Sequence, residues 1–163
     1  MMDSKTEGDE KVYEKLESLI KHGFRILDVG CGDGSFLNQI TKHHDISGVG
    51  IDPSPAKRED ADTNCTILKA ESVGELEEKF DLVYSINSLH HFGDVSEFFE
   101  GVPEKLKRPG NIILADWKEG ASTGRPESYF SREHISKLMT EAGFEVTESR
   151  DLERQFFLVG KLF

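Results

Sequence analysis

The fold is decided by residues Arg25–Phe36, which read RILDVGCGDGSF. Ile26, Leu27 and Val29 form an aliphatic run that is typical of a buried parallel strand. Three alternate glycines follow, and they supply positions without a Cβ where the chain can turn and a ligand can approach. A helix is predicted over Ser35–His43, with its free N–H groups and the positive end of its dipole facing that turn. The stretch therefore predicts a cradle for a nucleotide-bearing ligand.

The spacing of the glycines separates two kinds of nucleotide site. A dinucleotide fingerprint has its glycines at the first, third and sixth positions, but here Gly30, Gly32 and Gly34 stand at the first, third and fifth. Asp28 lies two residues before the first glycine, where a fixed carboxylate would repel a pyrophosphate and attract a cationic ammonium group. The pattern argues against an NAD-dependent dehydrogenase and favours a ligand that carries positive charge.

An acidic residue before Gly-x-Gly-x-Gly resembles motif I of the class I S-adenosylmethionine-dependent methyltransferases. Three further stretches resemble motifs of the same family, in the same order along the chain. Gly48–Ser54 resembles the second strand, Phe80–Phe92 the fourth strand with its active-site loop, and Lys107–Asn111 the turn into the fifth strand. Arg108 and Asn111 depart from the usual form of that turn, which affects only its local geometry.

The resemblance implies a three-layer Rossmann-like α/β fold with a seven-stranded, mostly parallel sheet and an antiparallel last strand. Alternating strand and helix patterns in the sequence agree with it. Strands are predicted over residues 25–29, 45–51, 65–69, 81–86, 112–117, 145–149 and 156–162, and helices over 11–21, 35–43, 55–60, 73–78, 95–99 and 132–142. The last two strands should pair as an antiparallel hairpin. Polar residues 1–10 predict a disordered tail, which leaves 11–163 as a single methyltransferase domain.

The resemblance also implies S-adenosyl-L-methionine as the cofactor. Asp52 follows Gly30 at about the 20-residue offset of a carboxylate that binds ribose hydroxyls, although it could instead cap a helix. Glu71 stands where many family members hold an acidic residue toward the adenine, and a helix-start carboxylate is the alternative. Asn87 follows the fourth strand and should lie beneath the sulfonium. The predicted cofactor-binding residues are Asp28, Gly30, Cys31, Gly32, Gly34, Asp52, Pro53, Glu71 and Asn87.

Histidines next to this loop suggest how a proton could be handled. His90 is the candidate catalytic residue, because a histidine there could act as a general base near neutral pH, or could simply close the pocket wall. Methyl transfer from a sulfonium needs positioning more than a nucleophilic side chain. No metal site is expected, since adjacent histidine pairs lack the i, i+4 spacing of a chelating helix.

The methyl acceptor is less visible in the sequence. Asn87 is not followed by the Pro-Pro-aromatic run of enzymes that methylate amide or exocyclic amino nitrogens, so a small-molecule acceptor is expected. Trp117, Tyr129 and Phe130 could line its pocket or cap the core, and Arg125 could meet an anionic group or face solvent. A shallow pocket would need a lid from a homodimer mate or a partner chain. A protein that binds the cofactor without turnover is the alternative function.

Composition limits the remaining classes. The 163 residues, 36% hydrophobic and 31% charged, suit one soluble domain. A formal net charge of -11 works against binding to nucleic acid. No run approaches the roughly 18 apolar residues of a membrane span, and the first residues lack the apolar core of a signal peptide. A cytoplasmic protein without a membrane partner is therefore expected, with Cys31 and Cys65 reduced.

Overall fold

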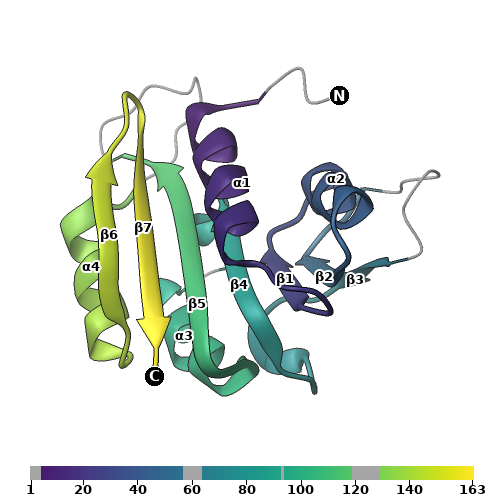
Figure 1. Cartoon of the computed structure of the whole chain (residues 1–163). Coiled ribbons are helices and arrows are strands. Elements are labelled where there is room, and N and C mark those ends of the chain that lie inside the picture. The colour runs from purple at the N-terminus through teal and green to yellow at the C-terminus, as the bar shows by residue number, and fades with distance from the viewer. Residues whose placement is uncertain (1–4, 57–63, 93, 119–128) are drawn as a thin grey trace.

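The computed structural model describes residues 5–56, 64–92, 94–118 and 129–163. One sheet contains all seven strands of these residues, in the order β3-β2-β1-β4-β5-β7-β6 (Figure 1). The strands are β1 (Arg25–Val29), β2 (Ser47–Asp52), β3 (Cys65–Lys69), β4 (Phe80–Ile86), β5 (Leu106–Trp117), β6 (Glu145–Asp151) and β7 (Gln155–Leu162). Neighbours from β3 to β5 are parallel, whereas β7 runs antiparallel to both β5 and β6. The predicted Rossmann-like sheet is confirmed.

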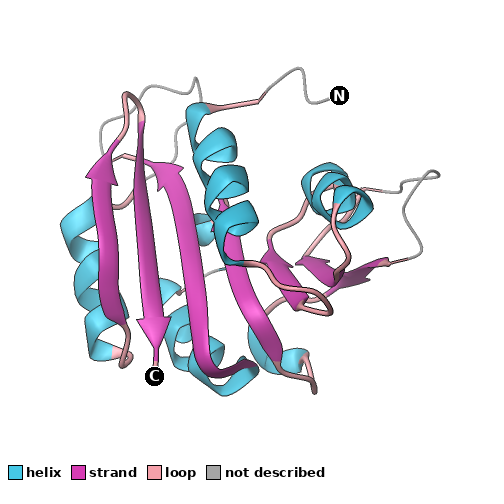
Figure 2. Ribbon diagram, viewed as in Figure 1, coloured by secondary structure: helices cyan, strands magenta, loops and turns pink. Residues whose placement is uncertain are grey.

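Helices cover both faces of this sheet (Figure 2). The α-helices are α1 (Glu7–Leu19), α2 (Ser35–His43), α3 (Val95–Gly101) and α4 (Arg132–Glu141), and the short 3-10 helices are η1 (Val73–Glu75), η2 (Leu89–Phe92) and η3 (Val102–Lys105). On one face, Leu16 of α1 and Leu37 of α2 are buried in one apolar cluster. On the other, Phe98 of α3 and Ile135 of α4 are buried in a second cluster. No helix of the described residues is both long and apolar enough to cross a membrane.

The first helix begins earlier than the sequence predicts. α1 starts at Glu7, so residues 7–10, expected to belong to a disordered tail, are helical. The reason is a capping box, in which Thr6 Oγ1 accepts from the Asp9 N–H at 3.1 Å and the Thr6 N–H donates to the Asp9 carboxylate at 2.6 Å. The apolar spacing begins only at Val12, but the cap, and not the apolar stripe, sets where the helix starts.

Other predicted elements differ from the structure or fall outside the described residues. The helix expected over residues 73–78 is reduced to the single 3-10 turn η1. The helix expected over 55–60 falls mainly on residues 57–63, which lie outside the described residues. The run Lys107–Asn111, expected to be a turn, lies within β5 as an irregularity of the ladder, because Phe80 pairs with Leu106 and Leu82 with Asn111. β2 begins at Ser47 rather than at Asp45.

Candidate cofactor site

The turn between β1 and α2 requires glycine for its backbone. Gly30, Gly32 and Gly34 have φ values of 85°, 58° and 80°, in the left-handed region that other residues rarely adopt. The N–H groups of Gly30 and Cys31 both donate to the carbonyl of Ile51, at 2.8 and 3.0 Å. These bonds fasten the turn to the end of β2, so that the two predicted binding segments lie together at the carboxyl edge of the sheet.

The glycines differ in what lies beside them. A Cβ on Gly32 would meet no atom within 4 Å, whereas a Cβ on Gly34 would lie 2.7 Å from Ile67 Cδ1. Gly32 thus presents bare backbone to open space, as a binding cradle requires. Gly34 lets α2 pack closely against β3, and its contact with a cofactor remains a prediction.

Asp52 is held at the end of β2 by backbone donors. Its Oδ2 accepts from the Gly32 N–H at 3.0 Å, and its Oδ1 accepts from the Ser54 N–H at 2.9 Å. No helix begins in residues 53–56, so the alternative role as a helix cap finds no support there. Asp52 and Pro53 are both partly exposed. The carboxylate therefore stands beside the open side of Gly32 with part of its surface available to a ligand.

Asp28, the fourth residue of β1, is a buried carboxyl group. Only 4% of it is exposed, and β1 places it opposite Gly50 and Tyr84 on the neighbouring strands. Burial raises the pKa of Asp28 to about 7; the Tyr84 hydroxyl favours the ionised form, while the carboxylates of Asp52 and Asp9 oppose it. Within the described residues no lysine or arginine forms an ion pair with Asp28. A cationic ligand group would supply the missing counter-charge.

The loop after β4 is bound to the glycine turn and to β5. Asn87 has a φ of 54°, which is uncommon outside glycine, and its N–H donates to the carbonyl of Ala115 at 2.8 Å. Ser88 Oγ lies 3.1 Å from the carbonyl oxygen of Gly30 and 2.9 Å from that of Ile86. The hydrogen bonds of the Asn87 N–H and of the Ser88 hydroxyl thus hold this loop next to the glycine turn.

Sequence reasoning missed a buried amide that contacts Asn87. Gln155, at the start of β7, is 2% exposed, and its Nε2 donates to Asn87 Oδ1 at 2.9 Å. The same amide reaches α1, where its Oε1 accepts from the Gly8 N–H at 2.9 Å and its Nε2 donates to Thr6 Oγ1 at 3.3 Å. The sequence carried little signal for it, because Gln155 is simply the last of three polar residues, Glu153–Gln155, before the apolar run Phe156–Val159.

Asp116 is a second missed residue. It is 2% exposed and its Oδ2 accepts from the Leu89 N–H at 3.1 Å, which holds the start of η2. His90 follows in η2, but its side chain lies outside the part of the structure that is described, so its role remains a prediction. A lone acidic residue in the apolar strand Ile112–Trp117 could have indicated the contact of Asp116.

Glu71 lies at the same edge of the sheet. It is exposed and follows β3, where the neighbouring Ala70 N–H donates to the backbone carbonyl of Asp52 at 3.1 Å. Cys31, by contrast, is a buried residue of the turn; burial, the largest cause, and the nearby Asp28 and Asp52 carboxylates raise the pKa of its thiol. Its contribution to binding would come from its backbone. The described residues contain no group of three or more His, Cys, Asp or Glu side chains that could hold a metal ion.

A pocket of about 260 Å³ lies beside Gln155. Its lining residues are Lys5, Thr6, Glu7, Trp117, Glu153, Arg154 and Gln155. Trp117 also carries the guanidinium of Arg154 over its ring, 5.3 Å from the centroid. Of the other predicted aromatics, Phe130 packs against the core on the α4 side and stacks on His134. Arg125 lies outside the described residues.

A family model described as a methyltransferase domain matches residues 7–149. The chain belongs to the methyltransferase domain family. It is 27% identical over 197 aligned positions to a ubiquinone biosynthesis O-methyltransferase of Rhizobium etli, covering 94% of this chain and 77% of that protein. A protein of the same description from Rhizobium johnstonii is 35% identical over 126 positions, covering 72% of this chain and 50% of the relative.

Solved structures agree with the fold. A SAM-dependent methyltransferase from Aquifex aeolicus superimposes with a TM-score of 0.76 at 19% identity, covering 95% of this methyltransferase and 89% of that chain. Together with the family match, this confirms the predicted class I, S-adenosylmethionine-dependent methyltransferase with a Rossmann-like fold. The chain spans between half and about three quarters of the two relatives named above, so the acceptor of the whole protein is a separate question.

Proposed function

We propose that this methyltransferase transfers a methyl group from S-adenosylmethionine to a small-molecule acceptor. One observation carries the proposal: at one edge of the sheet meet the open side of Gly32, the carboxylate of Asp52 and the buried carboxyl of Asp28, which forms no ion pair with a lysine or arginine of the described residues. Such a set of groups would bind a ligand that carries a positive charge and a pair of hydroxyls and that lies against bare backbone.

These residues fit the cofactor in separate roles. Asp28 would face the ammonium group of the cofactor, and Asp52 would accept hydrogen bonds from the ribose hydroxyls. Gly32 would leave room for the ligand, and the exposed Glu71 would face the adenine end. When bound, the cofactor supplies an electrophilic methyl group on a good leaving group. The chain itself needs no nucleophilic side chain for this chemistry.

The remaining work of the protein is orientation and proton removal. Holding the acceptor in line with the methyl group can contribute up to about 7–11 kcal/mol to lowering the barrier. The loop at Asn87, fixed by bonds to Ala115 and Gln155, would form the floor beneath the methyl group. His90, in the next turn, is proposed as the base that takes the proton of the acceptor.

The pocket beside Trp117 is proposed as the place where the acceptor lies. Gln155 lines this pocket and also donates a hydrogen bond to Asn87, so it connects the two. An indole ring and a volume of about 260 Å³ suit a small organic molecule. The names of the Rhizobium relatives, ubiquinone biosynthesis O-methyltransferases, support an acceptor that is a small molecule rather than a macromolecule.

Calorimetry with S-adenosylmethionine tests the cofactor, and release of S-adenosylhomocysteine over a panel of small phenols, amines and carboxylic acids tests the acceptor. Saturable binding followed by turnover with a member of the panel is expected. Absence of saturable binding would overturn the proposal, and binding without turnover on any acceptor would favour a non-catalytic binding protein. Activity that falls on dilution together with a change in sedimentation would show that a second copy completes the site.

A further inference from the structure

Gln155 connects two parts of the molecule that are distant in sequence. Its amide binds the first turn of α1 through Gly8 and Thr6, and binds the loop after β4 through Asn87. All of these partners are polar groups at or near the candidate site, and Gln155 itself is almost completely buried. A buried amide with every partner in place holds its neighbours in one geometry, because losing it would leave several polar groups unsatisfied.

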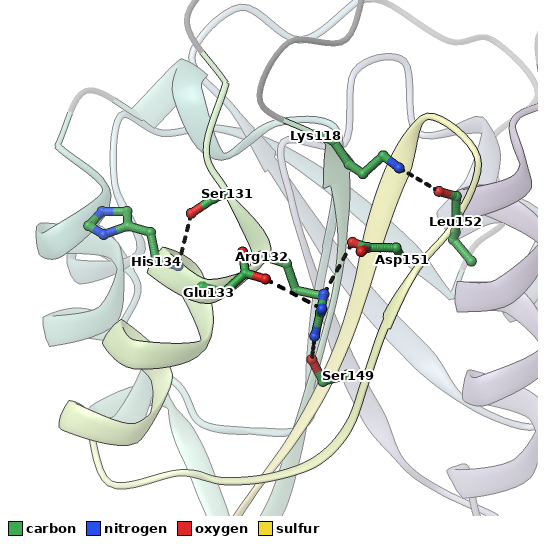
Figure 3. Close-up of polar contacts among 8 residues, drawn as sticks. All are labelled: Lys118, Ser131, Arg132, Glu133, His134, Ser149, Asp151 and Leu152. Carbon is green, nitrogen blue, oxygen red and sulfur yellow. Dashed lines mark hydrogen bonds and ion pairs between the residues drawn. The ribbon is translucent and has the colours of Figure 1, made fainter.

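Arg132 of α4 and Lys118, just after β5, form hydrogen bonds to the β6–β7 hairpin (Figure 3), and Gln155 lies in this hairpin. Arg132, at the start of α4, donates to Asp151 Oδ1 at 3.1 Å and to Ser149 Oγ at 2.6 Å. Lys118 Nζ donates to the carbonyl of Leu152 at 2.9 Å. The turn is closed by the Leu152 N–H, which donates to the carbonyl of Gln155 at 2.8 Å. Gln155 therefore projects from a hairpin that Arg132 and Lys118 support.

The first turn of α1 fits closely against this support. A Cβ on Gly8 would lie 2.5 Å from Gln155 Nε2 and 3.0 Å from Ala115 Cβ, so only glycine allows the helix to approach so near. The Gly8 N–H is one of the free donors at the start of a helix, and Gln155 satisfies it. The same turn carries Asp9, and the negative charge of its carboxylate raises the pKa of Asp28. The docked turn thus stands beside the cofactor site.

We propose that Gln155 is a positioning residue that couples docking of the first turn of α1 to the geometry of Asn87, and hence to cofactor binding. The inference rests on the proposed function, because Asn87 matters only where a cofactor is bound beside it. Coupling between two sites is reciprocal. Cofactor binding should therefore hold the first turn of α1 more tightly, and loosening that turn should weaken cofactor binding.

Gln155→Met is the first test, since methionine keeps an unbranched side chain of similar length but forms none of the three hydrogen bonds. Hydrogen exchange of residues 8–10 is measured with and without S-adenosylhomocysteine, and the affinity for it by calorimetry. We expect about tenfold faster exchange in the ligand-free variant and about tenfold weaker binding. In the parent chain the ligand should slow the same amides.

Gly8→Ala provides a second variant, in which the substituted residue lies in α1 and not in the sheet. Alanine normally stabilises a helix relative to glycine, so an undocked α1 would keep or gain protection. Here the added Cβ must displace the Gln155 amide, and we expect faster exchange of the first turn and weaker binding of S-adenosylhomocysteine.

Asn111→Leu is the matched control. Asn111 lies in β5, opposite the far end of β7 from Gln155, and its Nδ2 donates to the carbonyl of Gly160 at 3.2 Å. It should leave both readouts unchanged. Parental affinity and parental exchange in both Gln155→Met and Gly8→Ala would overturn the inference while the proposed function stands. A parent chain that does not bind S-adenosylmethionine or S-adenosylhomocysteine would instead overturn the proposed function.

Discussion

Replacing Asp28 with Asn should stabilise the folded chain, and should do so more at pH 8 than at pH 5. Burial raises the pKa of Asp28 from 3.8 to about 7. Between these values the folded state binds more protons than the unfolded state, so the contribution of Asp28 to the free energy of unfolding falls as the pH rises. The group destabilises the fold fully above pH 7 and has little effect below pH 4.

The size of the effect follows from the two pKa values. A difference of about three units corresponds to about 4 kcal/mol at pH 8, at 1.36 kcal/mol per unit. At pH 5 the unfolded state has lost its proton but the folded state has not, and the same linkage gives only about 2 kcal/mol. Asparagine carries no titratable group, so the gain in stability of Asp28→Asn should be larger at pH 8 by about 2.5 kcal/mol.

Urea unfolding followed by circular dichroism at the two pH values measures this difference. With a slope of about 2 kcal/mol per molar urea, the midpoint of Asp28→Asn relative to the parent should move by about 1 M more at pH 8 than at pH 5. Asp94→Asn is the control, because Asp94 is an exposed N-cap of α3 and asparagine caps equally well. An Asp28→Asn variant whose stability relative to the parent is the same at both pH values would refute the reasoning.

Three further outcomes are expected. Binding of S-adenosylmethionine at pH 6.5 should release up to about one proton, because a cationic ligand lowers the pKa of Asp28. Calorimetry in buffers of different ionisation enthalpy measures the number of protons released, and the Asp28→Asn variant should release none. Gly32→Ala should weaken binding about tenfold or more through strain at φ 58° and loss of open space, whereas Gly74→Ala, with no atom closer than 3.7 Å to its Cβ, should not. With an acceptor from the panel, His90→Gln should lower turnover by about 10²-fold or more with cofactor affinity unchanged; unchanged turnover would show that His90 only lines the pocket.

The centre of the site could be read from the sequence because its causes are local. An aliphatic run, glycines at alternate positions and a following apolar stripe predicted β1, the turn and α2, and both elements have the predicted bounds. The glycines also predicted a turn in the chain, and all three have positive φ. The spacing of residues along the chain is enough to predict local structure where each residue acts through its own backbone.

Other features depend on contacts between distant residues. Gln155 and Gly8 are 147 positions apart, so no local pattern relates them, and the capping pair Thr6 and Asp9 escaped notice beside a more obvious apolar stripe. The Lys107–Asn111 run carries turn residues, but pairing with β4 draws it into a strand. In each case tertiary packing or capping outweighed the local pattern.

The order of the strands has a consequence for how the protein is made. β7 follows every other described strand in sequence, yet it lies between β5 and β6 in the sheet. Until β7 joins the sheet, α1 has no Gln155 amide to pack against, and Asn87 lacks its hydrogen bond from Gln155. Because synthesis proceeds from the N-terminus, a nascent chain that has exposed the glycine turn but not yet Gln155 holds an unfinished site. If Gln155 couples α1 to Asn87 as proposed, cofactor binding would be completed only once β7 has joined the sheet.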